Sequence, residues 1–267
     1  MSRVLLWAAV GAVLLLCVLP VAYLLAVSFK TPDEILTGSF LPPTGTLANW
    51  PAAFTHVPLL RLVGNSLLAG AGGALLALAI ALPAAYAIVR LELGGRFLPG
   101  LALGSYIAPP VVALLPLFYL LRSLGLLNSV TALVLVYGMG NMPVALWLLG
   151  SFLRQVPAEI DEAAAIDGAS LPVLLARVVV PLLLPGLLTT GMICFLLGYN
   201  EFLLASVFAT GDSARTVPVG LSLFQGERLV NFGQMAAASL AAMVPVYAIG
   251  LAFQRQLVAG LVQGAVK

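Results

Sequence analysis

The sequence predicts an all-α membrane protein with six transmembrane helices, on two observations. Hydrophobic residues make up 62% of the 267 positions and charged residues only 8%, whereas soluble globular domains contain about 25% charged residues. Six windows without any charge each exceed the ~20 residues that a helix needs to cross the hydrocarbon core. A soluble fold would lack polar residues to cover its surface, and a net charge of +2 provides no basic footprint for nucleic acid.

The chain is interpreted as a single transmembrane domain over residues 1–267. The predicted spans lie near residues 4–28, 62–89, 97–121, 127–153, 178–200 and 233–254. Residues 30–61 are expected to form an extracytoplasmic loop, because the four prolines and the polar side chains of its charge-free stretch 35–60 do not suit a regular lipid-exposed helix. A short interfacial helix is expected near Trp50–Phe54. Both termini are expected in the cytoplasm, which places seven of the 12 Lys and Arg residues on that side.

Several catalytic and cofactor-binding signatures are absent from the sequence. It contains no Gly-x-x-x-x-Gly-Lys-Ser/Thr loop for ATP phosphates and no hydrolase signature of the His-Glu-x-x-His or Gly-x-Ser-x-Gly type. The single histidine, His56, cannot form a metal site by itself. We therefore expect neither an enzyme nor a metal or cofactor bound by this chain.

The most polar internal stretch covers residues 154–181 and holds six of the 22 charged side chains. Acidic residues are followed by three alanines, which suits a helix start and a helix interior, and Gly168 can adopt the left-handed conformation that ends a helix. We expect two short helices joined at Gly168, with Pro181 and Pro185 breaking the chain before the fifth span.

One face of the first short helix is predicted to be smooth, because helical spacing brings four of its residues together. These are Ile160, Ala163, Ala164 and Asp167. Such a face suits docking of a partner, whereas an ordinary amphipathic connector between two spans is the alternative interpretation.

The motif E-A-A-x-x-D-G-A at Glu162–Ala169, followed after a fixed gap by two prolines, resembles the coupling loop of bacterial ABC importer permeases of the carbohydrate-uptake type. The resemblance covers nearly the whole chain. It includes Ser151–Pro157, Gly198–Phe202 with Tyr199 where tryptophan is usual, and the tail Phe253–Lys267, which is typical of the second, maltose-type permease subunit. One departure is Leu175, where the family often has an aromatic residue.

This resemblance implies a type I ABC importer permease fold with a cytoplasmic coupling helix, in a bacterial or archaeal cytoplasmic membrane. It implies a second permease subunit as a heterodimer partner, two copies of a cytoplasmic ATPase that bind ATP and Mg, and an extracytoplasmic solute-binding protein. The solute would be a sugar or polyol. The residues implied to couple to the ATPase are Glu162, Ala163, Ala164, Asp167, Gly168 and Ala169, with Glu162 as a polar contact and Gly168 as the turn.

Polar residues near the spans are candidates for lining the path. Asn141 is expected either to mark a broken helix beside a cavity or to make an interhelical hydrogen bond. Glu201, next to Tyr199 and Asn200, is expected either to line the path or to anchor a helix at the headgroups.

Three other functions remain open from the sequence: an ion-coupled secondary transporter, a permease for a solute other than a sugar, and a membrane scaffold without a path. A secondary transporter would place ionisable residues within its spans, and the six windows contain none.

Overall fold

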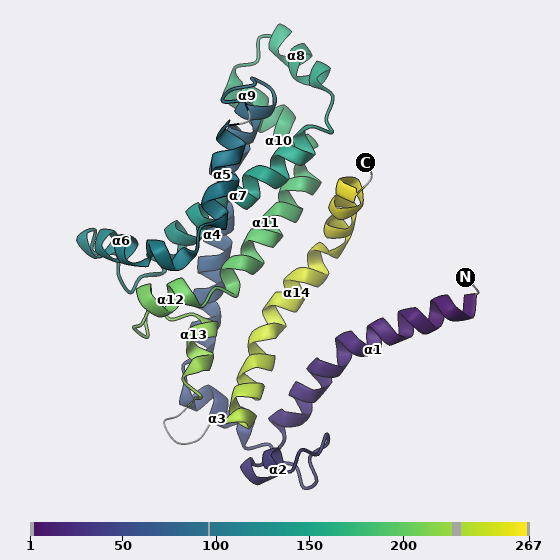
Figure 1. Ribbon diagram of the computed structural model, residues 1–267, viewed down its shortest axis with the longest axis vertical. Helices are drawn as coiled ribbons and strands as arrows, with labels where there is room; N and C mark the ends of the chain where they lie inside the picture. The colour runs from purple at the N-terminus through teal and green to yellow at the C-terminus, as the bar shows by residue number, and fades with distance from the viewer. Residues whose placement is uncertain (1–2, 96, 226–230, 266–267) are drawn as a thin grey trace. The chain divides into compact units, whose positions relative to one another are not determined.

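The computed structural model describes residues 3–95, 97–225 and 231–265 (Figure 1), and these form helices and turns without a β-strand. The chain divides into two compact units. Unit 1 combines the residues up to Arg61 with Pro218–Tyr247, and unit 2 combines Leu62–Val217 with the residues after Tyr247. Arg96, Arg228 and Lys267, which entered the predicted topology, lie outside the described residues.

Four described helices are long and apolar enough to cross a membrane. They are α1 (Arg3–Ser28), α4 (Leu59–Val89), α7 (Val130–Leu153) and the first 24 residues of α14 (Phe232–Ala265). Two bent helix pairs bring the number to six if each pair is one span. The all-α membrane fold predicted from composition is therefore confirmed.

The third predicted span, residues 97–121, is not one straight helix. It is divided into α5 (Phe97–Ile107) and α6 (Pro110–Ser123), and the helical segments on either side of the break differ in direction by 92°. The cause lies in the dipeptide Pro109-Pro110, because a proline lacks the backbone N–H and disfavours helical geometry in the residue before it. Pro109 accordingly has an extended ψ of 126°.

Unit 2 is built around close contacts of α4 and α7 with α11 (Leu184–Tyr199). Glycines permit these contacts. A Cβ on Gly73 would lie 2.8 Å from Cβ of Tyr137, and a Cβ on Gly138 would lie 2.6 Å from a methyl group of Leu76. Small residues at these positions let the backbones of membrane helices approach one another.

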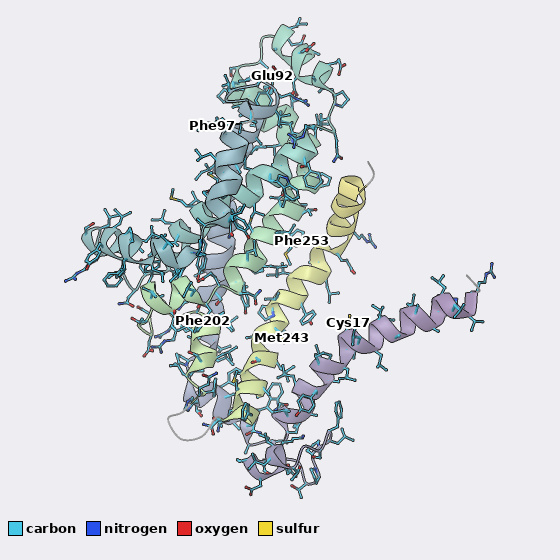
Figure 2. The ribbon with its side chains drawn as sticks, viewed as in Figure 1. Cys17, Glu92, Phe97, Phe202, Met243 and Phe253 are labelled. Carbon is cyan, nitrogen blue, oxygen red and sulfur yellow. The ribbon has the colours of Figure 1, made fainter. Side chains whose placement is uncertain are left out.

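The part of α1 that precedes Ala26 is exposed around most of its circumference, and Figure 2 shows Cys17 on this helix. An apolar surface on all sides is typical of a membrane-spanning helix.

The predicted extracytoplasmic loop has its own ordered structure within unit 1. It contains α2 (Pro32–Leu36) and α3 (Asn49–His56), and α3 includes the helix expected near Trp50–Phe54. Asn49 Nδ2 donates hydrogen bonds to the carbonyls of Ser28 and Lys30, at 3.0 and 2.9 Å. The buried Lys30 ammonium donates to the carbonyl of Ser39. Side chains therefore hold this loop against the end of α1.

Candidate functional site

The polar stretch after α7 forms four short elements in unit 2. They are α8 (Ala158–Ile166), α9 (Leu171–Leu174), the π-helix η1 (Leu175–Val179) and α10 (Val180–Leu182). The last three continue from one to the next, and α11 follows after an 84° bend. The bend falls at Leu183, between Pro181 and Pro185, where the missing N–H groups of the prolines weaken the helical hydrogen bonds.

The end of α8 is a Schellman motif centred on Gly168. This glycine has φ +83°, in the left-handed region that favours glycine. The N–H of Ala169 donates to the carbonyl of Ala164 and the N–H of Gly168 donates to that of Ala165, both at 3.0 Å. Ala164 and Ala169 also pack against a buried apolar cluster formed by Tyr86, Phe152, Leu153, Leu174, Val179 and Leu183. The turn thus fixes how α8 leaves the bundle.

The inward face of α8 carries an ion pair. The guanidinium of Arg90, the residue after α4, donates from Nε to Asp161 Oδ2 at 2.6 Å. Its Nη2 donates to the carbonyl of Val156 at 2.6 Å. Both side chains of the pair are largely buried, at 12% and 7% exposure. This pair was not expected from the sequence, because its partners lie 71 residues apart in the chain.

The outward face of α8 is exposed and combines acidic with apolar side chains. It presents Glu159, Glu162, Ala163 and Ile166 at i, i+3, i+4 and i+7 spacing, and Ile166 is 86% exposed. The face expected from the sequence is partly wrong: Ile160, Ala163 and Asp167 are exposed, but Ala164 is half-buried against the cluster. The burial of Asp161, one turn before Ala164, shifts the exposed face by about one position.

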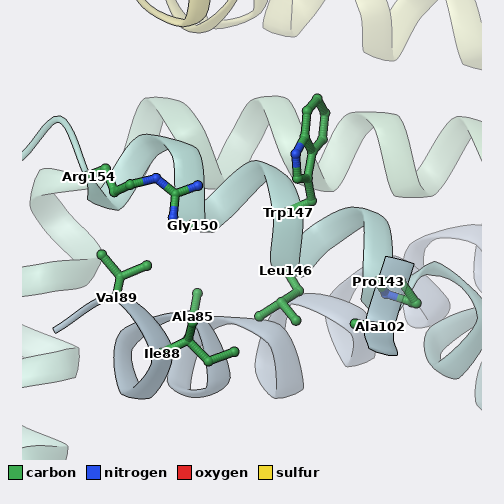
Figure 3. Close-up of a pocket in the computed structure, with 9 residues that line it drawn as sticks. All are labelled: Ala85, Ile88, Val89, Ala102, Pro143, Leu146, Trp147, Gly150 and Arg154. Atoms are coloured by element: carbon green, nitrogen blue, oxygen red, sulfur yellow. The ribbon is translucent and has the colours of Figure 1, made fainter. Parts of the chain in front are cut away.

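A cleft lies between α4, α5 and α7 in unit 2 (Figure 3). Its lining is Ala85, Ile88, Val89, Ala102, Pro143, Leu146, Trp147, Gly150 and Arg154. Apart from the indole N–H and the guanidinium, the walls are apolar. A sugar carries many hydroxyl groups that need hydrogen-bond partners when they leave water, so this cleft does not suit a sugar.

The candidate path residues lie at the other end of α11. Glu201 accepts hydrogen bonds from the N–H groups of Leu204 and Ala205 at 2.9–3.0 Å, which caps α12 (Leu203–Phe208). Its Oε2 also accepts from the hydroxyl of Tyr137 at 3.3 Å. Asn200 is exposed, and its Nδ2 donates to the carbonyl of Leu196 at 2.8 Å.

The remaining two candidates lie within helices. Tyr199 ends α11, is buried, and packs its ring 5.8 Å from that of Phe195. Asn141 donates to the carbonyl of Cys194 at 3.3 Å, and α7 continues through it without a break. The broken helix considered for this position is therefore wrong, and the interhelical hydrogen bond is present.

Comparisons with known proteins place these features in a family. Residues 77–262 match the model of the binding-protein-dependent transport system inner membrane component. The sulfoquinovosyl glycerol transport system permease protein SmoH of Agrobacterium fabrum is 38% identical over 93% of this chain and 88% of its own length. The trehalose/maltose transport system permease protein MalG of Thermococcus litoralis is 35% identical over 97% of this chain and 95% of its own.

Solved structures show the same fold at lower identity. A chain of a bacterial ABC transporter involved in the import of the acidic polysaccharide alginate aligns with a TM-score of 0.75 and 22% identity, over 96% of this chain and 98% of that one. A chain of the MetNI methionine ABC transporter aligns with a TM-score of 0.59 and 20% identity, over 76% of this chain and 95% of that one.

Proposed function

We propose that this chain, which belongs to the family of binding-protein-dependent transport system inner membrane components, is the permease subunit of an ATP-driven importer of a sugar or related polyol. The names of its relatives support the solute class, because SmoH and MalG are permeases for sulfoquinovosyl glycerol and for trehalose/maltose. The permease fold shared with two ABC importer structures supports the transport role.

In this proposal, α8 is the coupling helix. Its outward face, with Glu162, Ala163 and Ile166 exposed, docks on a cytoplasmic ATPase that binds ATP and Mg. Large exposed apolar side chains next to charges are typical of an interaction surface. The observation that carries the proposal is this exposed face on a helix whose other side is held by Asp161 and Ala164.

The wider assembly is proposed from the family. A second permease subunit completes the translocation path as a heterodimer, two ATPase copies bind from the cytoplasm, and an extracytoplasmic binding protein delivers the solute. α8 and both termini then face the cytoplasm of a bacterial or archaeal cell. Among the path candidates Asn200 is the strongest, because it is exposed, whereas Asn141 and Glu201 are half-buried and Tyr199 is buried.

The docking role is tested by the charge reversal Glu162→Lys. We expect a normal level of the protein in the membrane, weaker copurification of the ATPase and slower ATP-dependent uptake, because a lysine would replace an acidic contact at the interface. The matched control is Asp33→Lys, which makes the same change at an exposed acid in the first turn of α2 and is expected to leave ATPase copurification unchanged.

Uptake into proteoliposomes distinguishes the proposal from an ion-coupled transporter. Solute should enter only when the ATPase, the second permease subunit and ATP are present. Entry driven by an ion gradient alone would reject the ATP-driven importer. Wild-type ATPase copurification with Glu162→Lys would instead reject Glu162 as a contact.

A further inference from the structure

We infer that Arg90 is a positioning residue of the coupling loop: its ion pair with Asp161 makes α8 move together with the end of α4. This inference rests on the proposed function of α8 and adds to it a non-covalent connection between the ATPase-binding helix and the membrane bundle. The covalent connections run through residues 154–157 to α7 and through α9, η1 and α10 to α11.

The geometry places one guanidinium at two points of the loop. Nε donates to Asp161 Oδ2 in the first turns of α8, and Nη2 donates to the carbonyl of Val156 just before α8 begins, both at 2.6 Å. Two bonds from one planar group fix orientation as well as distance. Arg90 follows directly on the 31-residue helix α4, so the start of α8 is joined to the end of that helix.

The surroundings make this ion pair hard to replace. Asp161 Oδ1 is buried and has no hydrogen-bond partner among the described residues, so the carboxylate relies on Arg90 for its charge compensation. Burial lowers the effective dielectric constant around the pair and strengthens the attraction. Burial also makes an unpaired charge costly, so separating the two side chains, or removing one of them by mutation, is strongly unfavourable.

The other attachments of α8 are small and apolar. On the helix itself Ala164 packs on the buried cluster, and beyond the turn Ala169 does the same. Contacts made by methyl groups are weak individually and have no preferred direction. The ion pair is therefore the directional link between α8 and the end of α4, and it leaves the outward face of α8 free.

The deciding experiment replaces both partners, with Arg90→Met combined with Asp161→Leu, because this variant leaves no unpaired buried charge. The complete importer is reconstituted with its ATPase, and three quantities are measured: ATPase copurification, ATP hydrolysis and solute molecules imported per ATP. We expect copurification and hydrolysis to persist, while solute per ATP falls about fivefold or more, the lower end of typical coupling effects.

A purely structural role would not change this ratio. Wild-type solute per ATP in the double variant would overturn the inference, since the two charges would then only neutralise each other. Loss of ATPase copurification would also overturn it, because the pair would then be holding the docking face itself together. If the double variant fails to reach the membrane, Arg90→Lys decides in the same way: a reduced ratio supports the inference and a wild-type ratio rejects it.

The matched control is Asp212→Asn, which breaks the pair of Arg215 with Asp212, a carboxylate 68% exposed. Exposed pairs contribute little, so solute per ATP should not change. Failure of the proposed function is recognised separately, by solute uptake that proceeds without ATP.

Discussion

Two short helices of unit 2, α8 before α11 in the chain and α12 after it (Figure 1), are each held by a carboxylate, and the two carboxylates have different partners. Asp161 of α8 is paired with Arg90, which belongs to a different part of the chain. Glu201 is held by backbone N–H groups at the start of α12 itself. The first arrangement joins two elements, whereas the second mainly stabilises one helix.

The two helices also differ in exposure, and α8 is the more exposed of the two. α8 buries only Asp161, whereas α12, a shorter helix, buries Ala205 and Phe208. α12 is packed into the bundle by its own side chains, and α8 stands out from it. The greater exposure of α8 agrees with its proposed role as the helix that a partner contacts.

The largest effect is expected from breaking α8 in its last turn. In Ala164→Pro the proline removes a helical N–H and its ring meets the preceding turn, which costs about 3 kcal/mol locally. ATPase copurification should be lost, while membrane insertion of the spans persists, because the spans do not depend on α8. Pull-down from detergent extracts, with immunoblotting of the membrane fraction, measures both quantities.

The matched control for this change is Ala158→Pro at the first position of α8. A proline is tolerated there, since that N–H has no helical partner. ATPase binding should therefore survive. If Ala164→Pro binds the ATPase as well as the control does, α8 is not the docking helix.

A smaller effect is expected from removing the carboxylate that holds α12. Glu201→Ala removes the carboxylate that accepts from Leu204 and Ala205 and should lower stability by about 1 kcal/mol, the usual size of a lost helix cap. Glu201→Gln keeps an acceptor and should lose less. Thermal unfolding of the purified complex ranks the stability of the wild type, Glu201→Gln and Glu201→Ala. ATPase copurification should be equal in all three.

The smallest effect is expected in a pH titration of Glu34, a third carboxylate, which like Glu201 is held by hydrogen bonds from nearby groups and not by an arginine. Glu34, in unit 1, accepts hydrogen bonds from the Thr44 hydroxyl at 2.6 Å, the Thr31 N–H at 2.9 Å and the Thr44 N–H at 2.7 Å. These bonds, led by the Thr44 hydroxyl, lower the pKa of Glu34 to about 2 from an ordinary 4.5. A lowered pKa means that the stabilisation is complete above the ordinary pKa and is lost as the pH falls through the lowered one.

The loop around Glu34 should therefore stay ordered at pH 3.5, where an ordinary glutamate is mostly protonated. Thr44→Val should raise the pKa and bring the loss of order to higher pH. Hydrogen exchange at the Thr31 and Thr44 amides reports this order. Equal pH dependence in the wild type and Thr44→Val would contradict the assignment of the hydroxyl as the leading cause.

Much of the fold was predictable because hydropathy and glycine positions act locally. Charge-free windows located the long helices, and the sequence around Gly168 predicted the turn that ends α8. The same local logic would have found α2, since Thr31-Pro32-Asp33-Glu34 is a capping box with proline at the first helical position. The prolines at 109 and 110 likewise contained the signal for the break between α5 and α6.

The ion pair of Arg90 with Asp161 was not predictable in this way, because 71 residues separate the partners and only the tertiary fold brings them together. Each residue alone had a simpler local explanation. The role of Glu201 was undecided for a related reason, since whether an acid at a helix end caps the next helix depends on the backbone that follows it.

The division of α8 into an inward and an outward face has an evolutionary consequence. Glu159, Glu162 and Ile166 are exposed, while Asp161 and Ala164 hold the helix in place. Under the proposed docking role, mutations of the exposed side chains would change which ATPase is recognised without disturbing the membrane bundle. Grafting the three exposed side chains of one importer onto another is accordingly the smallest exchange by which a permease could be made to accept a foreign ATPase.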